Sequence, residues 1–256
     1  MDFNIKKPLH ILALLLISVS FFIIIILPIF SFVGMFPTTQ SIEFEQLSES
    51  LRLMSEIFIL IFQLALVFVL LVLIPVLWYI LVNETSIKDS FSRMKLRLQN
   101  IDMAFLWGIL AAGLIFVVIF AIELLFIGMG HSAEDLSNIP DIQQLFSWPT
   151  LFFLVAFQPI GEEIFFRGFL FEKIEGYAGG YIAIFITAFL FGLAHMSYGK
   201  IFPVLMPILM GVVLGFIVLK TKNLYSAIVA HIAFNVTSLT LAYLGWSLIE
   251  DAALIL

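Results

Sequence analysis

The residues best suited to chemistry lie inside a long apolar run, where the adjacent Glu162 and Glu163 are followed by Arg167. A charged side chain near the centre of a bilayer costs about 2.5 to 3.5 kcal/mol on insertion scales, so charges placed there indicate a functional site. On a helix, residues four apart share a face, whereas adjacent residues point about 100° apart. Glu163 and Arg167 are therefore expected to pair, while Glu162 faces elsewhere in apolar surroundings and is the better candidate for a general base.

A histidine on the next apolar run, His195, is predicted to reach the same depth as Glu162. The glycine-rich segment from Gly176 to Gly180 lies midway between these two residues and contains turn-forming dipeptides. Folding the chain there into an antiparallel helical hairpin places Glu162 and His195 about 24 Å from the turn on neighbouring helices. The hairpin therefore brings a carboxylate and an imidazole together.

The last apolar run contributes His231 and Asn235, which share a helix face. His231 lies about 12 Å beyond Asn223, where that helix begins, and so reaches a depth similar to that of Glu162. A lone histidine inside a membrane is more often a packing residue than a catalytic one. Convergence of one carboxylate, two imidazoles and an amide on one buried cavity instead favours activation of a water and stabilisation of an oxyanion.

The composition requires these residues to be positioned by membrane helices. The 256 residues are 62% hydrophobic and 12% charged, whereas ordinary soluble domains are about 25% charged. The absence of cysteine excludes thiolate nucleophiles and cysteine-based metal sites, so any metal would be held by His, Asp or Glu. The net charge of -6, without a basic stripe, argues against nucleic acid as a partner.

Apolar runs of about 20 residues, the length that spans a bilayer, recur along the whole chain. They predict an all-α polytopic bundle of about seven transmembrane helices, forming a single membrane domain over residues 1–256. The predicted spans lie near 9–35, 55–82, 101–129, 149–171, 180–198, 201–219 and 224–247.

The basic residues predict the orientation of the bundle, because Lys and Arg accumulate on cytoplasmic loops. If successive spans cross the membrane in alternating directions, most of the basic residues fall on one side of it. We therefore expect a multi-pass protein of the cell membrane, with the N-terminus in the cytoplasm and the C-terminus outside. The residues on the cytoplasmic side would be Lys6, Lys7, Lys88, Arg93, Lys95, Arg97, Lys173, Lys220 and Lys222.

Three motifs occur in a fixed order on the late spans: Glu-Glu-x-x-x-Arg at 162–167, Phe-x-x-x-His at 191–195 and His-x-x-x-Asn at 231–235. In this order they resemble the CPBP family of intramembrane proteases, which includes the type II CAAX prenyl endopeptidases. The resemblance covers a core from about Trp148 to Leu244. It implies an endopeptidase that hydrolyses a peptide bond of a membrane-associated protein or peptide.

The resemblance also implies a role for each motif residue. Glu162 and His195 would activate the water that attacks the peptide carbonyl, and His231 and Asn235 would stabilise the resulting oxyanion. The remaining motif residues would support the site structurally: Glu163, Arg167 and Phe191.

A metal is the open question of such a site. Glu162, His195 and His231 could supply three zinc ligands with an open fourth position. The chain has no His-Glu-x-x-His motif, however, and the site can work as a metal-free glutamate protease. We therefore expect no cofactor, with zinc as the alternative.

The function retains two alternatives from other classes. Intramembrane Glu and His residues also serve transporters and proton relays, although inverted repeats typical of transporters are not detectable here. A non-catalytic immunity or scaffold protein could bind a peptide in the same cavity. Prenyl endopeptidases of the resembled family typically have more spans than the seven expected here, so the substrate class stays open beyond membrane lipids and a membrane-associated protein or peptide.

Overall fold

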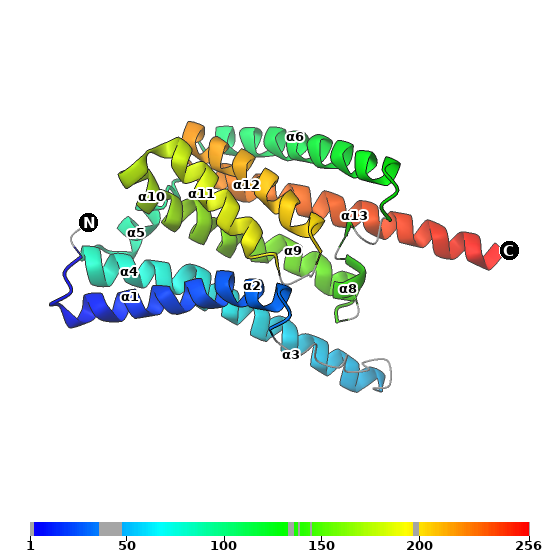
Figure 1. The fold of residues 1–256 in the computed structure, drawn as a ribbon, viewed down its shortest axis with the longest axis horizontal. Helices are drawn as coiled ribbons and strands as arrows, with labels where there is room; N and C mark the ends of the chain where they lie inside the picture. Colours follow the sequence, from blue (N-terminus) through cyan, green and yellow to red (C-terminus); the bar gives the residue numbers. More distant parts are fainter. Residues whose placement is uncertain are drawn as a thin grey trace.

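The computed structural model describes residues 3–35, 48–132, 136–137, 139–143, 145–196 and 200–255, and every regular element among them is a helix. Helices α1 and α4 run along one edge of the bundle and α6 along the opposite edge, with α9 to α13 between them (Figure 1). The elements are α1 (Pro8–Phe21), η1 (Phe22–Ile26), α2 (Leu27–Phe32), α3 (Glu49–Val67), η3 (Phe68–Leu73), α4 (Ile74–Asn83), α5 (Ile87–Arg93), α6 (Ile101–Gly128), α8 (Ile139–Gln143), α9 (Trp148–Glu163), η4 (Ile164–Leu170), α10 (Phe171–Ala178), α11 (Gly180–Leu193), α12 (Phe202–Thr221) and α13 (Tyr225–Ile255).

Six helical stretches are long and apolar enough to cross a membrane, which confirms the predicted all-α polytopic bundle. The span expected near 180–198 is shorter than these six stretches. Its helix, α11, has 14 residues and is therefore about 21 Å long, less than the roughly 30 Å of a bilayer core. Residues 197–199 at its expected end lie outside the described residues. The six long stretches are Pro8–Phe32, Glu49–Asn83, Ile101–Gly128, Trp148–Ala178, Phe202–Thr221 and Tyr225–Gly245.

Three of these stretches contain a π-helical segment, labelled η1, η3 and η4. Such wider turns occur frequently at functional sites, where they change the direction of the side chains that follow. The segment η4 begins directly after Glu163 and carries Arg167. Pro159, which lacks a backbone N–H, lies inside α9 just before it. The backbone is therefore irregular where the acidic and basic side chains of the first motif lie.

Glycines allow the helices around this segment to pack closely. A Cβ atom on Gly211 of α12 would lie 2.9 Å from Cα of Ala188 on α11, and Gly215 similarly faces Ile184. On the other side of the bundle, a Cβ atom on Gly108 of α6 would lie 2.8 Å from the Val229 side chain of α13. The pair Gly211 and Gly215 therefore serves packing within the bundle.

The hairpin between α10 and α11 is tighter than the segment from Gly176 to Gly180 suggests. Helix α10 continues to Ala178 and α11 begins at Gly180, so Gly179 alone separates the two helices. Its φ of 85° lies in the region that favours glycine, and this one residue is sufficient to reverse the chain. Gly176 remains helical.

Ionic and polar contacts join the ends of four helical segments at one end of the bundle, which we call the basic end after Lys95, Lys220 and Lys222. Glu175 of α10 binds two of these lysines, with Oε2 at 2.6 Å from Lys95 Nζ and Oε1 at 3.1 Å from Lys222 Nζ. Asn223 Nδ2 donates to two backbone carbonyls of the loop before α6, at 3.0 and 3.1 Å. Burial lowers the pKa of Lys95, and the contact with Glu175 opposes that effect.

Candidate active site

The first motif forms a fully buried ion pair. Arg167 Nη1 donates to Glu163 Oε1 at 2.9 Å, and both side chains have an exposed fraction of zero. The guanidinium also lies over the ring of Phe191 on α11, with its Cζ atom 4.3 Å from the ring centroid. Arg167 Nε and Nη2 have no hydrogen-bond partner among the described residues. The pairing expected from helical spacing is present, and Phe191 extends it across to α11.

His231 of α13 lies between the two glutamates. Its Nδ1 is 2.9 Å from Glu163 Oε1, and its Nε2 is 3.7 Å from Glu162 Oε2, which is too long for a hydrogen bond. The sequence assigned Glu163 to Arg167 alone, because adjacent helical residues diverge. The structure differs because the two nitrogens lie on separate edges of the imidazole, so one ring from a neighbouring helix can face both carboxylates.

Glu162 is held on its own helix by a residue that the sequence analysis missed. Gln158, one turn earlier on α9, donates from Nε2 to Glu162 Oε1 at 2.8 Å. Gln63 of α3 in turn donates to Gln158 Oε1 at 3.3 Å. The side chain of Glu162 is 11% exposed, whereas that of Glu163 is completely buried. Of the two carboxylates, Glu162 is thus the one that water can reach.

The same spacing rule that paired Glu163 with Arg167 could have found Gln158, since residues i and i+4 share a helix face. Gln63 carries a weaker signal, a lone amide within an apolar stretch. Its proximity to Gln158 depends on how α3 packs against α9.

His195, at the end of α11, lies within electrostatic range of Glu162 and His231 and is half-buried. Its Nδ1 donates to the carbonyl oxygen of Phe191 at 2.8 Å. The Phe191 ring packs edge-on against both histidines, with centroids 4.7 Å from His195 and 5.7 Å from His231. Phe191 therefore contacts both imidazoles and links α11 to α13 at the site.

Asn235 is placed near the site only by its position on α13. It follows His231 by one helical turn, about 6 Å along the axis. It is half-buried, and in the described part of the chain its side chain makes no hydrogen bond. Direct contacts thus join Glu162, Glu163, Arg167 and His231, while Asn235 contributes an amide one turn away.

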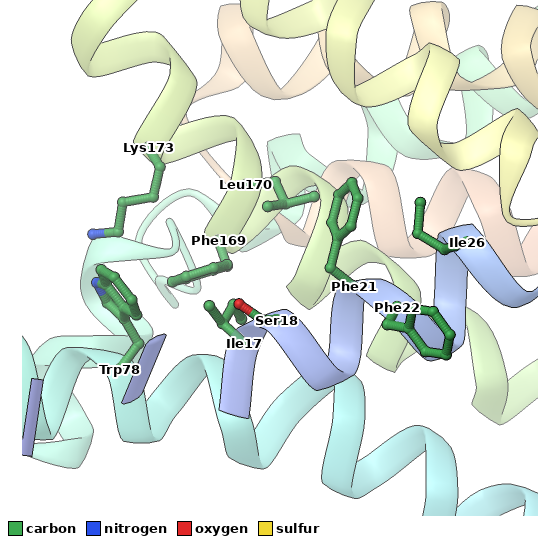
Figure 2. A pocket seen from close by; sticks show the side chains of 9 residues that line it. All are labelled: Ile17, Ser18, Phe21, Phe22, Ile26, Trp78, Phe169, Leu170 and Lys173. Carbon is green, nitrogen blue, oxygen red and sulfur yellow. The ribbon is translucent and has the colours of Figure 1, made fainter. Parts of the chain in front are cut away.

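A cavity of about 500 Å³ lies beside the site-bearing helix, between η1 and η4 (Figure 2). Its single charged lining residue, Lys173, is 2.8 Å from Glu172 Oε2 and 4.1 Å from the ring centroid of Tyr79. The cavity contains none of the motif residues 162, 195, 231 and 235. Its lining residues are Ile17, Ser18, Phe21, Phe22, Ile26, Trp78, Phe169, Leu170 and Lys173.

The candidate metal ligands in this site are Glu162, His195 and His231. Within the described ranges, no three His, Asp or Glu side chains are grouped closely enough to hold a metal ion. Glu162, His195 and His231 do not form such a group in this arrangement.

Comparison with known proteins adds one finding. Residues 144–237 match a family model described as type II CAAX prenyl endopeptidase Rce1-like. No curated protein and no solved structure matches the chain. The matched segment contains all three motifs, and the match confirms the resemblance inferred from them.

Proposed function

We propose that this chain, a polytopic membrane protein with a type II CAAX prenyl endopeptidase Rce1-like domain at residues 144–237, hydrolyses a peptide bond of a membrane-associated protein or peptide. The observation that carries the proposal is the environment of Glu162. This carboxylate is oriented by Gln158, faces His231 and keeps a small exposed fraction inside a membrane bundle. A structural ion pair has no need of that exposure.

Glu162 acts as the general base in this proposal. It takes a proton from a water whose oxygen then attacks the carbonyl carbon of the peptide bond. His195 assists at the same water. Because its Nδ1 donates to the Phe191 carbonyl, the neutral ring has its proton acceptor at Nε2. When the C–N bond breaks, the protonated base returns a proton to the leaving amine.

The oxyanion that forms on the carbonyl is stabilised by His231 and Asn235. Glu163 accepts from His231 Nδ1, which fixes the orientation of the ring, and Arg167 fixes Glu163 in turn. This is the same logic by which a buried carboxylate orients the histidine of a catalytic triad. Glu163 and Arg167 are positioning residues, and they do not touch the substrate.

The proposal needs no metal, and it places the N-terminus of the chain in the cytoplasm. Lys95, Lys220 and Lys222 at the basic end would then face the cytoplasm, as the positive-inside rule favours. The C-terminus lies outside if the short helix α11 counts as a seventh crossing.

The test uses purified protein in detergent with a panel of membrane-associated peptides, prenylated and unprenylated, and mass spectrometric detection of both cleavage products. Glu162→Gln keeps the size of the side chain and its acceptor for Gln158. It should lower the cleavage rate by about 10²- to 10⁴-fold, the usual contribution of a general base. The matched control is Glu123→Gln, a half-buried membrane carboxyl of α6, which should cleave at the normal rate.

Two outcomes would remove the proposal. Undiminished cleavage by Glu162→Gln would exclude this carboxylate as the base. If no peptide of the panel yields a cleavage product, the chain is not a peptidase. Solute flux through sealed vesicles would then indicate a transporter, and peptide binding without cleavage would indicate a binding protein.

A further inference from the structure

A second cavity, which we call the α6–α12 groove, has a volume of about 620 Å³ and is lined by residues of α6 and α12. Helix α6 forms the edge of the bundle opposite α1 (Figure 1). The groove runs between two antiparallel helices, since α6 begins at the basic end and α12 finishes there. Its lining residues follow helical spacing on both sides: Asn100, Met103, Ala104, Trp107, Leu110, Ala111, Leu114, Val213, Phe216, Ile217, Lys220, Thr221 and Asn223.

The two ends of the groove differ in polarity. Asn100, Lys220, Thr221 and Asn223 lie together at the basic end, while the rest of the lining is apolar. From Asn100 to Leu114 the groove follows α6 for about 21 Å, somewhat more than half of a roughly 30 Å bilayer core. The groove therefore spans one leaflet and its interface.

Lys220 gives the polar end a positive charge that no carboxylate of the described residues neutralises. The other lysines near this end are paired, Lys95 and Lys222 with Glu175 and Lys173 with Glu172. Lys220 Nζ instead lies 5.3 Å from the ring centroid of Phe216, a groove residue one turn earlier. The ammonium is thus held over the mouth of the groove.

The nearest acidic residue in the sequence of α6 does not oppose this charge. Asp102 lies in the first turn of the helix, but it is not among the groove residues. Within the helix, the lining positions 103, 104, 107 and 111 form one stripe, and position 102 projects about 200° away from Ala104 at the helical angle of about 100° per residue. Asp102 therefore does not face the groove, and Lys220 is the charged residue among those that line it.

From these observations we infer that the α6–α12 groove binds one anionic phospholipid, with its phosphate at Lys220 and an acyl chain along α6. Basic pockets between transmembrane helices at a membrane face are known to accept anionic head groups. The cavity near η1 lacks an unpaired positive charge for a phosphate, because its Lys173 forms an ion pair with Glu172. A volume of about 620 Å³ falls within the roughly 300 to 1,000 Å³ of small-molecule sites and is too small for a partner helix.

The experiment is native mass spectrometry of the full chain in detergent, titrated with phosphatidylglycerol or with phosphatidylcholine carrying the same acyl chains. The wild-type protein should retain one phosphatidylglycerol with severalfold preference over phosphatidylcholine. Lys220→Ala should weaken phosphatidylglycerol binding about fivefold, the equivalent of about 1 kcal/mol per basic residue near an anionic surface. Lys220→Arg should restore it. Lys88→Ala, which removes an exposed lysine outside the groove, is the matched control and should bind normally.

A second variant tests the apolar part of the groove. Ala111→Phe fills it from α6 and should weaken retention of both lipids, with the melting temperature reporting whether the chain still folds. Equal binding of the two lipids by the wild type, or normal phosphatidylglycerol binding by Lys220→Ala, would overturn the assignment. So would complete displacement of the lipid by inorganic phosphate, which would indicate an ion site only. Glu162→Gln should keep the lipid, so this result is independent of the proposed peptidase activity.

Discussion

The sharing of Glu163 between Arg167 and His231 predicts that the two halves of the ion pair contribute unequally to stability. Glu163→Met leaves the buried guanidinium without its carboxylate. Glu163 Oε1 is its one hydrogen-bond acceptor among the described residues, and arginine cannot discharge by losing a proton. Breaking a buried pair in this way costs about 3 to 5 kcal/mol of unfolding free energy.

Arg167→Met leaves the buried Glu163 carboxylate with one partner, because Glu163 Oε1 keeps its contact with His231 Nδ1 at 2.9 Å. The losses are the contact over the Phe191 ring, about 2 kcal/mol when desolvated, and one charged hydrogen bond. Methionine recovers part of this by packing. We expect a cost of about 1 to 3 kcal/mol, and for the double variant Glu163→Met/Arg167→Met a smaller cost than for Glu163→Met alone.

The assay is unfolding in mixed micelles titrated with a denaturing detergent, followed by the fluorescence of the four tryptophans. Glu123→Met serves as the control, because Glu123 is a half-buried carboxyl without an ion pair in the described part of the chain. If Arg167→Met proves as costly as Glu163→Met or more so, Glu163 does not keep His231 as a partner. If the double variant is less stable than both single variants, the orphaned-charge reasoning is wrong.

Two further predictions concern packing and positioning. Gly211→Ala should lower the free energy of unfolding by about 1 to 3 kcal/mol, because the added Cβ would lie 2.8 Å from Arg167 Nη2. The control is Gly113→Ala, whose Cβ would meet no atom within 4 Å, and it should unfold like the wild type in the same micelle titration. Gln158→Leu removes a hydrogen bond to a charged group, worth about 1.5 to 3 kcal/mol, and should lower kcat about 10- to 100-fold in the peptide assay with little change in KM. An unchanged kcat would show that Glu162 needs no orientation by Gln158.

Helical spacing predicted the contact between Glu163 and Arg167, and the same rule applies to Gln158 and Glu162, a contact that the sequence analysis missed. The pair of Glu163 and Arg167 needs only a local rise and rotation, and it survives even though η4 is a π-helix. Composition was sufficient for the membrane bundle, because no water-soluble fold exposes so much apolar surface. The ion pair depends only on residues close in sequence, and the membrane bundle depends only on the average composition of the chain.

Contacts between helices were harder to predict, because a depth estimate places a residue along the membrane normal but not around the helix axis. His231 was expected at the depth of Glu162, yet its contact with Glu163 depends on the rotation of α13. The short length of α11 could not be predicted from the sequence either. Its apolar composition continues up to His195, so hydropathy could not show that the helix ends at Leu193.

The two adjacent glutamates would respond differently to relaxed selection. Loss of Glu162 removes a partly exposed carboxylate whose proposed role is chemical, so the bundle would remain intact. Loss of Glu163 strands a buried cation in the centre of the protein and costs the fold as well. A lineage that abandoned catalysis while keeping a binding role would therefore be expected to change the first glutamate and retain the second. The pattern of substitution at 162 and 163 thus becomes a record of whether a related chain still works as an enzyme.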